Sequence, residues 1–263
     1  MIHQKYQNIL IEKEGYVGIL TINRPQKLNA INHETAIELC AAVRDLNDDK
    51  EVRAIVVKSS GNDFGSGEDI AALESDSTRP EGDKLSDHFC NIFETLEDAP
   101  KPITAAWQGR AIGGSYCMLY YCDTIVASED ARFQSGTINL GYTNVWRMKR
   151  MERCVGTKKA FEWIMSGDWI SAIECEKYGF VNSVVPRQEL DAAALQMATR
   201  FANKSPLAMQ VSKEGWIKAK DMSIKDSEAY LLALRESRLR GSEDYQEGLA
   251  AKREKREPVW KGR

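Results

Sequence analysis

The sequence predicts an α/β protein whose strands pair mainly in parallel. Short apolar strand candidates alternate with helix candidates through about the first 190 residues, and the remaining residues have helical character. The 263 residues include 43% hydrophobic and 29% charged residues, which is typical of a globular chain with an ample core. We therefore expect a core over residues 1–200 and a helical C-terminal region over residues 201–263.

Turn signals separate the elements of the N-terminal half. The strand candidate Val17–Ile22 ends at Asn23-Arg24-Pro25. Asn32 is a residue type that caps helix N-termini, and apolar residues at helical spacing follow it. The next elements are a strand at Ala54–Lys58, a short helix at Ala71–Glu74 and a helix at Asp87–Leu96. The polar residues 75–84 have the composition of a surface loop.

The stretch 101–123 combines a strand, a glycine turn and a helix. Ile103–Trp107 is an apolar strand candidate, Gly113-Gly114 forms the turn, and Tyr116–Tyr121 is the helix candidate. The first backbone N–H groups of a helix lack partners within the helix, and glycine lets a ligand approach them closely. Such a turn can bind a phosphate or hold an oxyanion, and the stretch alone does not distinguish the two.

The second half of the chain changes from alternating elements to helices. The elements that we expect are strands at Thr124–Ala127 and Val181–Val185, an irregular segment over Arg132–Gly141, helices over Val145–Ile164 and Ser171–Tyr178, and helices only from Glu189 onward. Helix breaks are predicted at Ser205-Pro206, near residues 221–223 and near Gly241.

Composition narrows the classes of function. The net charge of −3 argues against general nucleic-acid binding, and no apolar run approaches the roughly 20 residues of a membrane span. The N-terminus lacks an apolar signal core, so we expect a cytoplasmic protein. The three histidines show no ligand-like spacing and the six cysteines form no CxxC pair, so neither a metal site nor disulfides are expected. His33 and His88 fall at helix positions where an exposed side chain is the default.

A second glycine turn, FGSGEDI at residues 64–70, also follows a strand candidate. Each of the two turns can present one backbone N–H group at the start of a helix. Two such donors that converge on one oxygen would form an oxyanion hole, which stabilises developing negative charge. Two ordinary structural turns are the alternative, and the spacing does not decide between them.

Several short motifs occur together in one order. They are Asn23-Arg24-Pro25, Lys27-Leu28-Asn29-Ala30, Phe64–Ile70, Lys101-Pro102, Gly113-Gly114, Cys122-Asp123, Gly179-Phe180-Val181 and a tail over Glu254–Pro258. In this order and spacing the chain resembles the crotonase (enoyl-CoA hydratase/isomerase) superfamily over nearly its whole length. The resemblance implies a spiral of ββα-like units, a C-terminal helical trimerisation region, and a homotrimer or homohexamer. It also implies an acyl-CoA ligand, in which coenzyme A is part of the substrate and no separate cofactor is needed.

The resemblance assigns roles to two groups of residues. The backbone N–H groups of Glu68 and Gly114 would hold the thioester oxygen, and an enolate-like intermediate would follow from the polarised carbonyl. The residues that would contact coenzyme A are Lys27, Leu28, Ala30 and Ile70, and, from a neighbouring subunit, Trp260 and Lys261.

The chain departs from the family pattern where hydratases carry two glutamates that activate water. The matching positions are Cys117 and Thr137, so addition of water by the usual route is unsupported. Glu68 can act as acid or base if its side chain enters the pocket; alternatively it points to solvent or pairs with a lysine. Cys117 is either a nucleophile or a packed helix thiol. Thr137 can donate a hydrogen bond to an acyl group but cannot serve as a base.

Three functions remain open on these residues. The first is an enzyme that acts on an acyl-CoA through an enolate, as an isomerase, a decarboxylase or an unusual hydratase. The second is a CoA-thioester hydrolase of the same fold. The third is a non-catalytic acyl-CoA-binding homologue, because some branches of the family lack both glutamates and carry a tryptophan followed by basic residues, as Trp146-Arg147 here.

Overall fold

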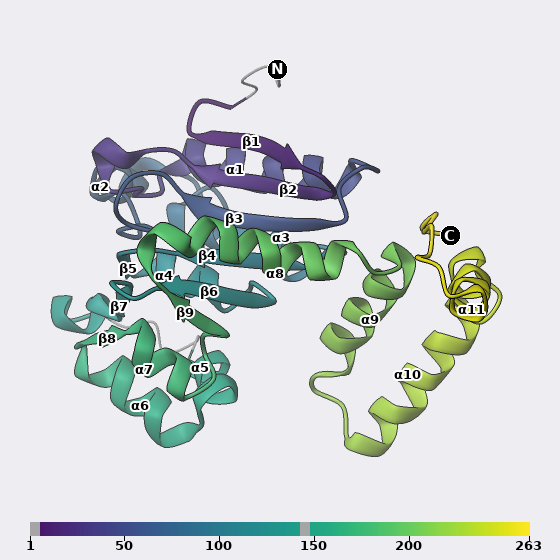
Figure 1. Ribbon diagram of the computed structural model, residues 1–263. Coiled ribbons are helices and arrows are strands. Elements are labelled where there is room, and N and C mark those ends of the chain that lie inside the picture. The colour runs from purple at the N-terminus through teal and green to yellow at the C-terminus, as the bar shows by residue number, and fades with distance from the viewer. Residues whose placement is uncertain (1–5, 143–147) are drawn as a thin grey trace.

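The computed structural model describes residues 6–142 and 148–263, and a six-stranded sheet lies at its centre (Figure 1). The strands, in spatial order, are β1 (Ile9–Glu14), β2 (Val17–Ile22), β3 (Ala54–Ser59), β4 (Ile103–Trp107), β6 (Thr124–Ser128) and β9 (Ser183–Val185). A second sheet has the order β5 (Arg110–Ile112), β7 (Arg132–Gln134) and β8 (Trp169–Ser171). The α/β fold class predicted from the sequence is confirmed.

From β2 to β9 every neighbouring pair in the main sheet is parallel, as predicted. These strands are mostly apolar because helices cover both of their faces. Strand β1 was not predicted. It pairs antiparallel with β2 at the edge of the sheet, and its outer residues Glu12–Glu14 are exposed and charged, so it carries no continuous apolar run.

Helices cover the main sheet on both faces. Helix α1 (His33–Asp48) starts where expected, because the side-chain oxygen of Asn32 accepts a hydrogen bond from the Thr35 N–H. Its apolar side packs with that of α3 (Leu85–Glu97) into the larger core. On the other face α8 (Leu190–Ala202) packs against β2, β3, β4 and β6 and forms a second, smaller core.

Shorter helices connect these layers. They are α2 (Ile70–Ser75), α4 (Gly114–Leu119), α5 (Met148–Val155), α6 (Thr157–Ser166) and α7 (Ala172–Lys177). The prediction of an irregular segment over Arg132–Gly141 is wrong, because it contains β7 and a 3-10 helix over Gly136–Leu140. The start of the helical piece predicted from Val145 lies outside the described residues. Asn144 and Trp146-Arg147 lie outside them too.

The chain ends in three helices that extend to one side of the sheet (Figure 1). These are α9 (Pro206–Ala219), α10 (Ile224–Arg238) and α11 (Glu243–Glu254), and the breaks between them fall where the sequence predicted. Lys213 ties α9 to the sheet through an ion pair of 2.7 Å with Asp123. The boundary at residue 200 between the core and the helical C-terminal region stays a prediction. No helix in the described part of the chain is both long and apolar enough to span a bilayer.

Candidate active site

The two glycine turns lie side by side in the fold. The Gly65 N–H donates to the Arg110 carbonyl at 3.1 Å, and the Gly65 carbonyl accepts from the Ile112 N–H at 2.9 Å. The Gly67 N–H donates to Ser115 Oγ at 3.0 Å. A Cβ on Gly67 would lie 2.8 Å from the Ile112 carbonyl oxygen, so this close approach requires glycine. The fold therefore brings the starts of α2 and α4 together.

The Glu68 side chain turns toward the second of these turns. Its Oε2 accepts a hydrogen bond from the Gly114 N–H at 3.2 Å, and a Cβ on Gly113 would lie 2.9 Å from the same oxygen. Gly114 is the first residue of α4, so its N–H has no acceptor within the helix. The carboxylate is therefore bound to the second turn instead of to a lysine, and its role as acid or base stays a prediction.

The backbone N–H of Glu68 is the second donor that the sequence proposed. The backbone groups on either side of it already have hydrogen-bond partners. The Ile31 N–H donates to the Gly67 carbonyl at 2.8 Å, and the Asp69 N–H donates to the Ile31 carbonyl at 2.9 Å. The Glu68 N–H itself has no acceptor among the residues that the structure describes. Neither proposed donor is therefore engaged by a backbone carbonyl, and both can bind an oxygen of a ligand.

Cys117 and Thr137 come from neighbouring segments. Cys117 lies in α4 and is 1% exposed. The Tyr116 hydroxyl donates to Ser135 Oγ at 3.2 Å, which joins α4 to the segment that carries Thr137, and burial raises the pKa of Tyr116. Thr137 Oγ1 is buried and has no hydrogen-bond partner within residues 6–142 and 148–263. A buried hydroxyl in this state can pair with a ligand or with water.

The segment 25–30, which the resemblance places along coenzyme A, has a fixed shape. Leu28 and Asn29 adopt left-handed conformations with φ of 51° and 53°. Asn29 is buried, and its side-chain amide donates to the carbonyls of Ser60 and Asp63 at 2.8 Å each. Lys27 and Leu28 consequently present exposed side chains. The Ala30 side chain is only 8% exposed, so it offers little surface to a ligand.

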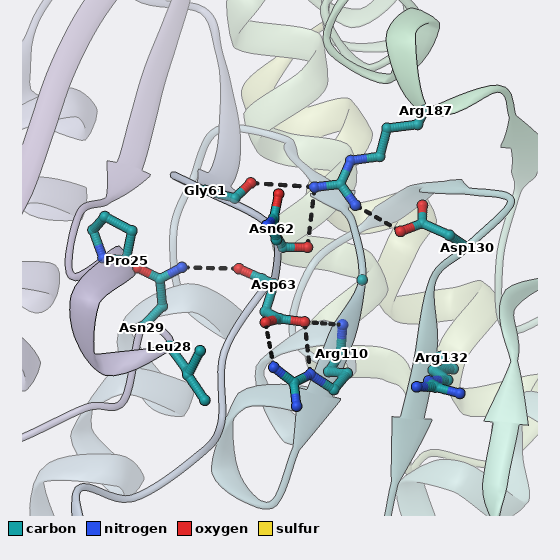
Figure 2. Close-up of a pocket in the computed structure, with 11 residues that line it drawn as sticks. Pro25, Leu28, Asn29, Gly61, Asn62, Asp63, Arg110, Asp130, Arg132 and Arg187 are labelled. Atoms are coloured by element: carbon teal, nitrogen blue, oxygen red, sulfur yellow. Dashed lines mark hydrogen bonds and ion pairs between the residues drawn. The ribbon is translucent and has the colours of Figure 1, made fainter.

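A cleft of about 670 Å³ opens on one side of this segment (Figure 2). Its charged lining residues are Asp63, Arg110, Asp130, Arg132 and Arg187, and Leu28 and Pro25 form its apolar border. Three arginines face two aspartates, so the cleft carries an excess of positive charge.

Ion pairs hold most of the charges in this cleft. Asp63 accepts two hydrogen bonds from the Arg110 guanidinium at 2.9 and 2.7 Å, which hold the pKa of the carboxyl below its usual value. Arg187 binds Asp130 at 2.6 Å and the carbonyl of Asn62 at 3.0 Å. Arg132 lies over the ring of Trp169, with 4.8 Å between its guanidinium carbon and the ring centroid.

A second cleft, of about 480 Å³, lies on the other side of the segment. Lys27, Arg24 and Arg79 line it together with Asp69. Arg24 is committed to the protein through Asp69 at 3.1 Å and the Ala30 carbonyl. Ile70, the first residue of α2, is 74% exposed next to Asp69. Lys27 lines this second cleft, Leu28 borders the first, and Ile70 stands between Asp69 and Ala71 of the second; their contact with coenzyme A stays a prediction.

The tail residues Trp260 and Lys261 are not part of this site in their own chain. The Trp260 indole N–H donates to the Asn203 carbonyl at 2.9 Å, and Lys261 pairs with Glu243 at 3.0 Å. Figure 1 places the C-terminus beside α11, on the opposite side of the molecule from α2 and β5. The tail therefore lies away from α2 and β5 of its own chain.

Two histidines expected at the surface pack against each other, His33 buried and His88 half-buried. The rings of His33 and His88 lie edge to face with centroids 5.4 Å apart, and their Nε2 atoms pair with Asp76 at 2.8 Å and Asp83 at 3.1 Å. Both aspartates belong to the polar loop after α2, and nothing in the spacing of the sequence indicates this contact. Among the described residues no cluster of three or more histidine, cysteine, aspartate or glutamate side chains could hold a metal ion.

Comparisons with known proteins agree on one family. The sequence profile described as Enoyl-CoA hydratase/isomerase matches residues 12–263. A probable mitochondrial enoyl-CoA hydratase from Dictyostelium discoideum is 34% identical over 250 residues, which cover 95% of this chain and 89% of that protein. A short-chain-enoyl-CoA hydratase from Clostridium acetobutylicum is 35% identical over 209 residues, which cover 79% of this chain and 80% of that protein.

Solved structures show the same relationship. An enoyl-CoA hydratase from Mycobacterium smegmatis superimposes with a TM-score of 0.89 at 29% identity, and the match covers 97% of this chain and 99% of the other. The likeness includes the C-terminal helices, because it extends over nearly the whole of both chains.

Proposed function

Because the chain belongs to the enoyl-CoA hydratase/isomerase family, we propose that it binds an acyl-CoA thioester and stabilises an enolate at the N–H groups of Glu68 and Gly114. One observation carries the proposal: the Gly114 N–H donates to a carboxylate oxygen at 3.2 Å. That oxygen has the charge and hydrogen-bonding character of an enolate oxygen. A donor that binds it is suited to negative charge that develops on a thioester carbonyl.

The reaction is not the usual two-glutamate hydration. A buried thiol and a hydroxyl, those of Cys117 and Thr137, stand where hydratases place their glutamates, and neither is a base at neutral pH. The Glu68 carboxylate bonds one donor of the proposed oxyanion hole. In the proposed step a C–H bond next to the thioester carbonyl breaks, its proton passes to Glu68, and its electron pair forms the enolate. Isomerisation begins with this step. Decarboxylation reaches the same enolate by loss of CO2 in place of a proton, and hydration reaches it by addition of water to a conjugated double bond.

Coenzyme A is proposed to lie over the segment 25–30. The segment is rigid, Leu28 is 46% exposed on it, and positively charged clefts open on both sides. The cations that can reach phosphate groups there include Lys27 and Arg79 on one side and Arg110 and Arg132 on the other.

The chain is proposed to work as a homotrimer or homohexamer. Its three last helices expose large apolar side chains that a monomer would leave in water. The most exposed of them are Trp216, Ile224, Leu232 and Leu249. In such an assembly Trp260 and Lys261 of one subunit are proposed to contact the coenzyme A of another, because they lie away from α2 and β5 of their own chain.

A panel of acyl-CoA thioesters analysed by mass tests the proposal. A changed acyl group still attached to CoA indicates enolate chemistry, release of free CoA indicates the hydrolase, and binding without turnover indicates the non-catalytic homologue. We expect Glu68→Gln to suppress turnover while free CoA still binds, because the amide cannot accept the proton. Glu14→Gln, on exposed β1, is the matched control. Full activity of Glu68→Gln would remove Glu68 from the mechanism.

A further inference from the structure

Glu68 takes part in the proposed oxyanion hole in two opposing ways, as a donor and as a competing acceptor. Its backbone N–H is one of the two donors, while its side-chain Oε2 already occupies the other donor, the Gly114 N–H, at 3.2 Å. The carboxylate is held against the turn, because the oxygen lies only 2.9 Å from where a Cβ on Gly113 would stand. The structure thus shows the hole with one donor filled by the protein itself.

We propose that the Glu68 carboxylate competes with the thioester oxygen of the substrate for the Gly114 N–H. The inference rests on the proposed function, since it needs a thioester in this hole. When two acceptors share one N–H, each is bound more weakly, and the carboxylate also repels the thioester oxygen, so a thioester that takes the full hydrogen bond displaces the carboxylate. No covalent bond changes in this exchange; one hydrogen-bond acceptor replaces another.

The exchange weakens the binding of carbonyl ligands specifically. A ligand without a carbonyl oxygen at this position leaves the Glu68–Gly114 hydrogen bond intact, whereas a thioester has to break a hydrogen bond to a charged acceptor, which is stronger than one between neutral groups. Once displaced, the carboxylate stays close to the hole because its side chain starts at residue 68. It would then lie beside the carbon next to the thioester carbonyl. Substrate binding would thereby release the base at the place where the proton is removed.

A matched pair of ligands separates this exchange from general effects on binding. The probes are butyryl-CoA, which has the thioester carbonyl, and S-butyl-CoA, the thioether of the same chain length without it. In Glu68→Ala, which keeps the backbone N–H, we expect the Kd of butyryl-CoA to fall about tenfold because no acceptor competes. The Kd of S-butyl-CoA should change less than about twofold. Calorimetry gives both values, and mass analysis confirms that the ligand stays intact.

Two further variants provide a second test and a control. Glu68→Asp shortens the side chain and should also tighten butyryl-CoA binding, even if Glu68→Ala folds poorly. Glu14→Ala, far from the turns, should leave both Kd values unchanged. An equal change for both ligands, or no change for either, would overturn the competition while leaving the proposed function in place. If neither CoA derivative binds any variant or the wild type, the proposed function fails and the inference fails with it.

Discussion

The ring of Phe89 lies against the Cα atom of Gly114. A Cβ on Gly114 would stand 2.2 Å from Phe89 Cε1, which is too close for two carbon atoms that are not bonded to each other. Phe89 belongs to α3 and is 3% exposed, so it has little room to move away. The proposed oxyanion donor is therefore fixed from behind by a side chain of the helix that follows the polar loop.

This contact predicts that Gly114→Ala destabilises the protein by overpacking, by roughly 1–3 kcal/mol in the free energy of unfolding. Urea denaturation measures the loss. The double variant Gly114→Ala with Phe89→Leu should recover part of it, because the smaller side chain makes room for the methyl group. Gly241→Ala is the matched control, since a Cβ there meets open space. A Gly114→Ala protein as stable as wild type would contradict the observed contact.

Local signals in the sequence located the regular elements well. Strand β2 is bounded as predicted, because an apolar run stands between Gly15 and Pro25, and α1 begins at the cap Asn32. Strands β5, β7 and β8 were missed. Each has three residues, too few to carry an apolar pattern, and forms only because tertiary packing brings it to its partner.

The candidate site was predictable in position but not in side-chain geometry. The sequence placed Glu68 and Gly114 at the two turns, but the direction of the Glu68 carboxylate depends on an N–H group 46 residues away. The His33–His88 contact likewise depends on how the polar loop folds back between α1 and α3. Interactions of this kind are set by the assembled structure and leave no periodic signal.

The burial of Cys117 predicts that its thiol is protected from solvent. Cys117 is 1% exposed, whereas Cys154 is exposed on α5. Iodoacetamide labelling of the native protein, mapped by mass, should modify Cys117 roughly tenfold or more slowly than Cys154, because the buried thiol reacts only after local opening. Labelling in urea is the control and should remove the difference. Rapid labelling of Cys117 in the native protein would support the interpretation of Cys117 as a nucleophile and contradict that of a packed helix thiol.

The burial of Lys101 predicts that the stability of the protein changes with pH in the alkaline range. Its ammonium is 5% exposed and donates to the carbonyls of Leu46 and Asp49 at the end of α1, at 2.7 Å each. Burial lowers the pKa of Lys101 from 10.5 to about 8. Between these values the unfolded chain binds more protons than the native chain, so the Lys101 contribution to stability rises with pH across this window, by roughly 2–4 kcal/mol in total.

The measurement is the difference in unfolding free energy between wild type and Lys101→Met at several pH values from 7 to about 10.5. Titrations of other groups cancel in this difference. The variant loses two hydrogen bonds and should be less stable throughout, so only the change with pH carries the prediction. The advantage of wild type should grow as the pH rises above about 8. A difference that stays flat or shrinks would show that Lys101 titrates normally.

The exposed apolar side chains of the C-terminal helices predict self-association. Trp216 is 81% exposed and Ile224 is 80% exposed, and burial of such side chains against a second copy is favourable. Light scattering should give about three or six times the 29.6 kDa of one chain. Trp216→Ser with Ile224→Ser should shift the mass toward that of a single chain. Ile173→Ser, at an exposed position of α7, is the matched control and should keep the assembled mass.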